Sequence, residues 1–160
     1  MKNLPILTQL LNDFGLECKA HPDSEVSFPN FFIPPKISYS IKSEINQNAF
    51  DELVFEFEKK YGTRYMFEDE DGIYAVEVDF TQRPIFSTTN KFKQACGEII
   101  FTPLRPFGRT ELFCVVDSTA AKKAVNEVMG YMIEFLRETL KCIKKEDPHV
   151  KKIKNSRFVP

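Results

Sequence analysis

The sequence contains only two histidines, and this limits the catalytic chemistry that it can support. His21 precedes Pro22 in an expected turn, and His149 lies near the C-terminus. A serine or cysteine nucleophile needs an adjacent base, which a third group holds in orientation. Because neither histidine lies in a segment expected to supply these groups, we do not expect a Ser–His or Cys–His pair. No Cys or His pair has the spacing of zinc ligands, so we expect no metal.

Carboxylates offer the other acid–base chemistry. Glu77 and Asp79 lie two residues apart on an expected strand, which places them on one face. The exposed face of an antiparallel sheet explains the same pattern, and we favour that interpretation. The acidic run 68–71 before Gly72 suggests a calcium loop, but Phe67 would occupy its first ligand position. We expect a hairpin turn there.

Phosphate-binding loops need clustered glycines between a strand and a helix. The six glycines of this chain are all isolated. Nucleotide binding of the P-loop or Rossmann kind is therefore excluded, and we expect no cofactor.

Two segments have residue types that suit contact with a partner. The run 105–109 places Arg105 and Arg109 around Phe107, and arginine can hold a carboxylate or phosphate through paired hydrogen bonds. A hairpin loop whose phenylalanine folds onto the core also explains it, and we favour that. Phe31 and Phe32 lie in a proline-rich stretch that could receive a partner's strand or helix, or form a lid over the sheet. These five residues are our candidate partner-binding residues.

Hydrophobic periodicity predicts the elements that position these residues. We expect a first helix over 4–14, strands over 16–20 and 36–42, and a second helix from Asn48 to Tyr61 that ends at Gly62. Residues 63–80 predict a hairpin that turns at Asp71-Gly72. The run 88–96 predicts a short helix stopped by Gly97, and 98–104 and 110–116 predict a second hairpin.

A long final helix is expected over 119–145, with Asp147-Pro148 as its stop. It has two adjacent apolar stripes, wider than one packed face requires. If one stripe packs on the sheet, the other is available to a second copy. The candidate dimer-interface residues on that second stripe are Ala124, Val128, Tyr131 and Phe135.

The element order predicts one α+β domain over 1–147, with an antiparallel sheet of about five strands and helices on one face. This order is loosely similar to that of small secretion chaperones and related dimeric binding modules, a similarity of element order alone. Residues 148–160 predict a mobile basic tail. The segment from Lys141 onward contains seven basic and two acidic residues, whereas the whole chain has a net charge of −1.

Four isolated cysteines, no signal-peptide pattern and no long apolar run predict a cytoplasmic protein that does not enter the membrane. We expect a non-enzymatic protein-binding module that acts as a homodimer, chaperone-like, adaptor or inhibitor in kind. A small enzyme or ligand-binding domain that uses carboxylates and arginines remains the alternative. A nucleic-acid accessory protein acting through the basic tail is a weaker one, because the net charge is close to zero.

Overall fold

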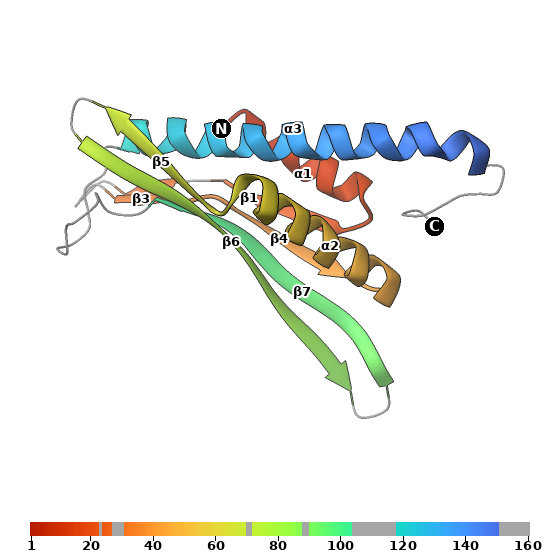
Figure 1. The fold of residues 1–160 in the computed structure, drawn as a ribbon. Helices are drawn as coiled ribbons and strands as arrows, with labels where there is room; N and C mark the ends of the chain where they lie inside the picture. The colour runs from red at the N-terminus through yellow and green to blue at the C-terminus, as the bar shows by residue number, and fades with distance from the viewer. Residues whose placement is uncertain (23, 27–30, 70–71, 88–89, 104–117, 151–160) are drawn as a thin grey trace.

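The computed structural model describes residues 1–22, 24–26, 31–69, 72–87, 90–103 and 118–150 (Figure 1). In chain order the elements are α1 (Asn3–Asp13), β1 (Glu17–His21), β2 (Ser24–Val26), β3 (Phe31–Ile33), β4 (Lys36–Ile41), α2 (Glu44–Tyr61), β5 (Arg64–Asp69), β6 (Gly72–Ser87), β7 (Asn90–Pro103) and α3 (Ser118–Val150). The predicted α+β class is confirmed, with a five-stranded antiparallel sheet and a long final helix.

The main sheet has the order β1-β4-β7-β6-β5, and every neighbouring pair in it is antiparallel. β2 and β3 form a separate two-stranded sheet. β6 and β7 are longer than the strands beside them. β4 pairs with β7 only from Ala95 onward, and β5 pairs with β6 only as far as Glu77. The end of their hairpin therefore projects beyond the rest of the sheet (Figure 1).

All three helices pack on one face of the main sheet, which we call the inner face (Figure 1). Alternation along the strands decides which side chains face the helices: Ile37, Tyr39 and Ile41 of β4 are buried, while Ser38 and Ser40 between them are only partly buried. The buried core from the described residues of β6 and β7 comprises Val76, Val78, Ala95, Ile99 and Phe101.

α1 and α3 pack against each other and are joined by hydrogen bonds. The backbone N–H of Asn3 donates to Asn126 Oδ1 at 2.9 Å, and Asn3 Nδ2 donates to the Asn126 carbonyl at 2.8 Å. Leu4, Leu7 and Leu11 of α1 are buried in the same core. This packing covers one flank of α3, in addition to the side that faces the sheet.

Most of the described side chains in both apolar stripes of α3 are consequently buried within the single chain. The first stripe contributes Val125, Met129, Met132 and Leu136 to the core. Ala124, Val128 and Phe135 of the second stripe are buried as well, and Tyr131 is partly exposed. α1, the sheet and α2 together cover more of the helix circumference than we expected. The reason for placing a dimer interface on Ala124, Val128 and Phe135 is therefore removed.

The predicted helix over 88–96 is wrong, because residues from Asn90 onward belong to β7. β7 pairs with β6 in a single long hairpin, and the predicted partner strand over 110–116 lies outside the described residues. α2 starts at Glu44 rather than Asn48, since Ser43 is its N-terminal cap. α3 continues through Pro148 to Val150, where the missing N–H of proline affects only the final turn. Within the described residues, none of the helices has the length and apolar character needed to cross a membrane.

Candidate functional site

α2 begins and ends at positions that the sequence defines locally. Ser43 has an extended backbone, and its side chain accepts a hydrogen bond of 3.0 Å from the N–H of Asn46. At the other end Gly62 has a φ of +78°, a conformation that side chains disfavour, and its N–H donates to the Glu58 carbonyl at 2.8 Å. The helix is therefore fixed at both ends over the inner face.

Aromatic contacts attach α2 to the core. The Phe57 ring lies 5.4 Å from Phe135 of α3 and 6.1 Å from Phe80 of β6, both in edge-to-face geometry. Phe50, two turns earlier, lies 4.9 Å from the Tyr39 ring of β4. Phe50 and Phe57 are the fully buried side chains of this 18-residue helix. Such ring pairs add about 0.5–1.5 kcal/mol each beyond the area they bury.

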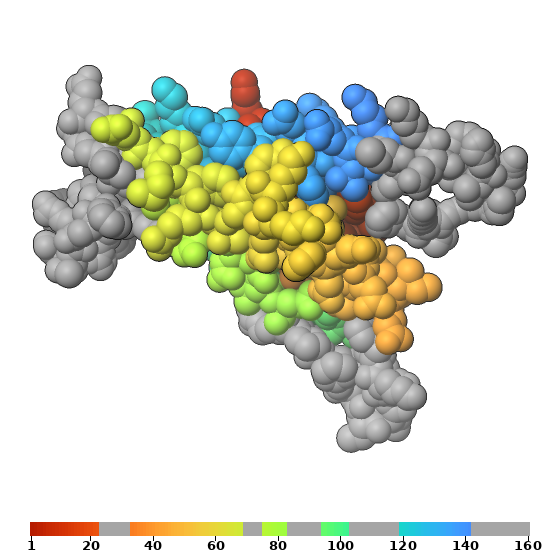
Figure 2. Space-filling view, viewed as in Figure 1, coloured from red at the N-terminus to blue at the C-terminus, as the bar shows by residue number. Residues whose placement is uncertain are grey.

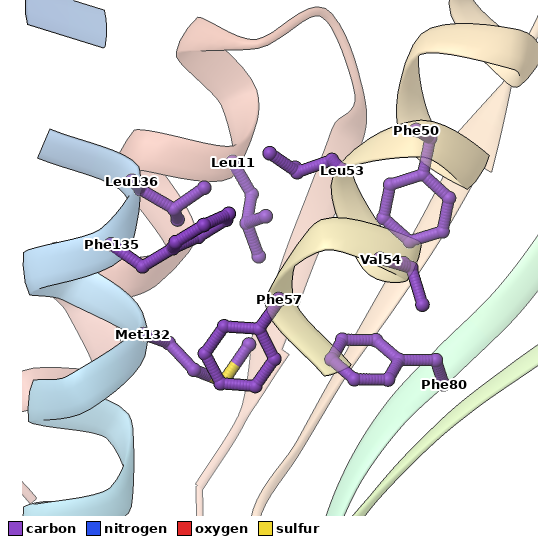
Figure 3. Close-up of a pocket in the computed structure, with 9 residues that line it drawn as sticks. All are labelled: Leu11, Phe50, Leu53, Val54, Phe57, Phe80, Met132, Phe135 and Leu136. Atoms are coloured by element: carbon purple, nitrogen blue, oxygen red, sulfur yellow. The ribbon is translucent and has the colours of Figure 1, made fainter. Parts of the chain in front are cut away.

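An apolar pocket lies between α2 and the elements beneath it, and its side chains converge on one another (Figure 3). Its volume is about 20 Å³, room for roughly one water-sized or methyl-sized group. Leu53, Val54 and Phe80 are only partly buried and give it access to solvent. The lining residues are Leu11, Phe50, Leu53, Val54, Phe57, Phe80, Met132, Phe135 and Leu136.

The solvent side of α2 combines exposed apolar side chains with acidic ones. Ile45 is 65% exposed and Phe55 is 59% exposed, unusually high values for large apolar residues. Five acidic residues and two lysines share this helix, and all seven are exposed. Atoms of α2, coloured orange to yellow, occupy the front of the molecule in Figure 2. The two most exposed large apolar side chains among the described residues therefore lie on α2, and Ile33, Met66 and Ile6 are exposed elsewhere.

The opposite, outer face of the sheet is polar and brings together groups that are distant in sequence. His21 Nε2 and Ser38 Oγ are 2.9 Å apart, and the Lys36 ammonium lies 2.8 Å from Glu98 Oε2. A Ser–His pair was not expected, because His21 was assigned to a turn. It instead ends β1, where antiparallel pairing places it beside β4. Strand register alone could have indicated this contact, and the register was not predictable.

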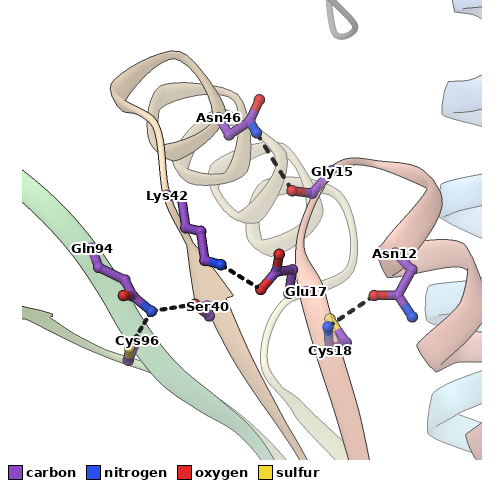
Figure 4. Close-up of polar contacts among 9 residues, drawn as sticks. All are labelled: Asn12, Gly15, Glu17, Cys18, Ser40, Lys42, Asn46, Gln94 and Cys96. Carbon is purple, nitrogen blue, oxygen red and sulfur yellow. Dashed lines mark hydrogen bonds and ion pairs between the residues drawn. The ribbon is translucent and has the colours of Figure 1, made fainter.

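Cysteine and amide groups form further contacts near the β1–β4 edge (Figure 4). Gln94 Nε2 donates to Ser40 Oγ at 2.5 Å and lies 3.6 Å from Cys96 Sγ. Cys18 is also a free thiol, and burial raises its pKa to about 12. A thiol with this pKa is almost entirely protonated at neutral pH, so Cys18 is a poor nucleophile.

The two predicted carboxylates do lie together. Glu77 and Asp79 share the outer face and line an open hollow of about 320 Å³ with Val78 and Thr102. Arg105, Phe107 and Arg109, which we expected as further polar or anchoring groups, lie outside the described residues.

Three further predicted residues lie in the described part of the chain: Phe31 and Phe32 from the partner-binding set, and Tyr131 from the dimer stripe. Phe31 and Phe32 lie on β3, which pairs with β2 and not with the main sheet. Tyr131 is the partly exposed member of the predicted dimer stripe, and its ring is 5.4 Å from that of Tyr65 on β5. Burial raises the pKa of Tyr65 to about 12, with Tyr131 and Tyr61 as smaller contributions.

Among the described residues, no three His, Cys, Asp or Glu side chains lie close enough together to hold a metal ion. Comparison with models of protein families, with curated proteins and with solved structures finds no match to this chain.

Proposed function

We propose that this protein is a non-enzymatic protein-binding module, and that α2 with the apolar pocket beneath it is the surface that receives the partner. The observation that carries the proposal is the packing of α2. It leaves Leu53 and Val54 partly exposed at the pocket, while Ile45 and Phe55 are largely exposed on the solvent side of the same helix. An apolar pocket that opens to solvent is a common feature of binding sites.

The chemistry of the pocket supports binding over catalysis. All nine lining residues are aliphatic or aromatic, or methionine. None of them can donate or accept a proton at neutral pH, and none is a nucleophile. A site of this composition gains free energy by removing an apolar side chain from water, at about 25 cal/mol per Å².

The charge around the pocket indicates the chemistry of the partner. α2 has an excess of acidic side chains, and its two lysines lie in its last turn. A partner segment with one apolar side chain for the pocket and basic side chains beside it would be complementary. We therefore propose an amphipathic segment with basic flanks as the bound element.

Methyl NMR of the full chain tests this proposal directly. The probe is a synthetic amphipathic helix of leucine and lysine, and a scrambled peptide of the same composition is its control. With the methionine methyl groups labelled, Met132 reports on the pocket and Met66 reports on the distant edge of the sheet. We expect saturable shifts of Met132 with the amphipathic peptide and little change at Met66.

Two variants on α2 complete the test. Val54→Glu puts a charge at the pocket and should weaken peptide binding about tenfold or more. Phe55→Glu, one residue away on the exposed side, should have a smaller effect, and Leu53→Gln provides a milder change at the pocket. Thermal unfolding confirms that each variant folds. Equal effects of Val54→Glu and Phe55→Glu, or unchanged Met132 signals with both peptides, would exclude the pocket as the docking site.

We also propose that the protein acts as a homodimer in the cytoplasm. The free thiols of Cys18 and Cys96 accord with a reducing compartment. Light scattering coupled to size-exclusion chromatography measures the mass of the particle, and fractionation of the native cells measures its location. A monomer at every concentration would contradict the homodimer, but it would not contradict the proposal that α2 and its pocket bind a partner.

A small enzyme is the second candidate, and one observation on the outer face favours it. His21 Nε2 lies within hydrogen-bonding distance of Ser38 Oγ, the geometry in which a histidine can activate a serine. Glu77 and Asp79 line a hollow on the same face. An active-site phosphonate that labels Ser38, and fails to label a His21→Ala variant, would establish this alternative.

A further inference from the structure

The edge of β5 that faces away from β6 has a row of main-chain N–H and C=O groups. The N–H of Val78 donates to the Thr63 carbonyl at 2.9 Å, so the pair formed by these residues is a hydrogen-bonded one. Alternation then directs the main-chain groups of Tyr65 and Phe67 toward β6 as well. The N–H and C=O groups of Arg64, Met66 and Glu68 point the other way. No strand pairs with this edge among the described residues.

The side chains of these three residues make the edge chemically distinctive. Met66 is 52% exposed on the outer face. Arg64 and Glu68 are exposed on either side of it, and within the described residues neither forms an ion pair. On the inner face Tyr65 and Phe67 are only partly buried, beside Tyr131. An apolar residue between opposite charges thus lies on an open strand.

Two other open edges of the main sheet have features that obstruct pairing, whereas the described residues of β5 include no proline and no side-chain cap on a main-chain N–H. On β1 the N–H of Cys18 already donates to Asn12 Oδ1 at 2.8 Å. On β6 beyond Glu77, Pro84 lies at a position whose main-chain groups face the open side, and it has no N–H to offer. Proline and side-chain caps are the usual means by which proteins protect sheet edges.

We propose that two copies of this chain pair through β5, antiparallel, about a two-fold axis that passes by Met66. In this register Met66 lies opposite Met66 of the second copy, and Arg64 lies opposite Glu68 of the second copy. Tyr65 then lies opposite Phe67 on the inner face. The two five-stranded sheets join into one continuous sheet, and both exposed methionines are covered.

The sequence of β5 selects this register over its alternatives. The two-fold axis can pass through a hydrogen-bonded pair at Arg64, Met66 or Glu68, or through a non-hydrogen-bonded pair at Tyr65 or Phe67. An axis at Tyr65 or Phe67 would place Arg64 or Glu68 opposite Met66 and would leave no pair of opposite charges within β5. An axis at Arg64 or at Glu68 would place two like charges opposite each other, which is destabilising. With Met66 on the axis, three hydrogen-bonded pairs form and both charged pairs are of opposite sign.

This proposal rests on the homodimer part of the proposed function and deepens it. Sedimentation velocity on the full chain, from about 1 μM to about 1 mM, measures the dimer dissociation constant. Met66→Lys places two ammonium groups together at the axis and should raise that constant at least about tenfold. Ile6→Lys is the matched control, because it adds the same charge at an exposed apolar residue of α1, which packs on β1 at the opposite edge of the sheet, and it should leave the constant unchanged.

Charge reversal tests the register itself. Arg64→Glu and Glu68→Arg each bring like charges together and should weaken the dimer, whereas the double variant exchanges the charges and should restore it. The two single variants, mixed in equal amounts, should form a heterodimer in preference to either homodimer. Because all these side chains are exposed, the variants should fold, and circular dichroism checks this.

The outcomes separate the two proposals. Dimerisation that Met66→Lys weakens and the exchanged pair restores supports pairing through β5. A dimer insensitive to all these variants would refute β5 pairing but retain the homodimer. A monomer at about 1 mM would refute both, and the methyl signal of Met132 with the peptide would still report on the α2 site.

Discussion

The Tyr39 hydroxyl donates a hydrogen bond of 2.8 Å to the Thr81 carbonyl, although β7 lies between the strands that carry these residues. The contact is possible because Gly97 of β7 lies beneath it and has no side chain. A Cβ at Gly97 would be 1.9 Å from the Thr81 carbonyl oxygen and 2.6 Å from the Tyr39 hydroxyl. Tyr39 also contacts Phe50, so the close approach of the strands supports α2 as well.

Gly97→Ala should therefore destabilise the fold severely, by about 3 kcal/mol or more, because main-chain atoms would have to move. Gly62→Ala is the matched control. It has open space around it and only an unfavourable φ, so about 1 kcal/mol is expected. Urea unfolding followed by circular dichroism compares the two. Similar costs would show that the crowding at Gly97 is not as described.

Phe57→Ala should cost about 3–5 kcal/mol, since it removes the ring that joins α2 to Phe80 and Phe135. Phe55→Ala, two residues earlier on the same helix, should change stability by less than about 0.5 kcal/mol, because its ring is exposed. The shift in urea midpoint measures both. A large loss from Phe55→Ala would mean that its ring is packed in solution.

Ser43→Ala should destabilise α2 by about 1 kcal/mol, because the N–H of Asn46 loses its hydrogen-bond acceptor. Ser43→Asp retains an acceptor and favours the helix dipole, so it should preserve most of the stability. Amide hydrogen exchange in the first turn of α2 reports the local effect. Equal protection in all three proteins would argue against the cap.

Stability should fall as the pH rises above about 10, where an unfolded tyrosine ionises. Burial raises the pKa of Tyr65 to about 12, and burial likewise raises the pKa of Tyr39 above its ordinary value. The folded state favours the neutral phenols, so their contribution is complete below pH 10 and is lost as the pH passes through the raised values. Urea midpoints between pH 8 and pH 11.5 measure the decline. Tyr65→Phe should make it shallower, and an unchanged slope would contradict the raised pKa of Tyr65.

The sequence predicts the local elements well where periodicity and capping agree. Alternation in 36–42 predicted β4, the pattern of 63–80 predicted the pairing of β5 with β6, and the apolar stripes predicted α1 and α3. The prediction of a short helix over 88–96 that ends at Gly97 is wrong, because Asn90–Pro103 forms β7. Glycine at that position serves a close approach between strands, and nothing in the local sequence distinguishes the two roles.

The sequence by itself determined the fold class of this protein: an α+β fold with an antiparallel sheet, an alternating apolar face on β4 and a long final helix. Only the tertiary structure decided which apolar surface is left over. Periodicity reports how much of a helix is apolar, but what covers it depends on packing partners that are distant in sequence. Here α1, α2 and the sheet bury most of the described apolar side chains of α3. The exposed large apolar residues lie elsewhere, at Ile6, Ile33, Ile45, Phe55 and Met66. The contact between His21 and Ser38 depended in the same way on strand register, which long-range pairing sets.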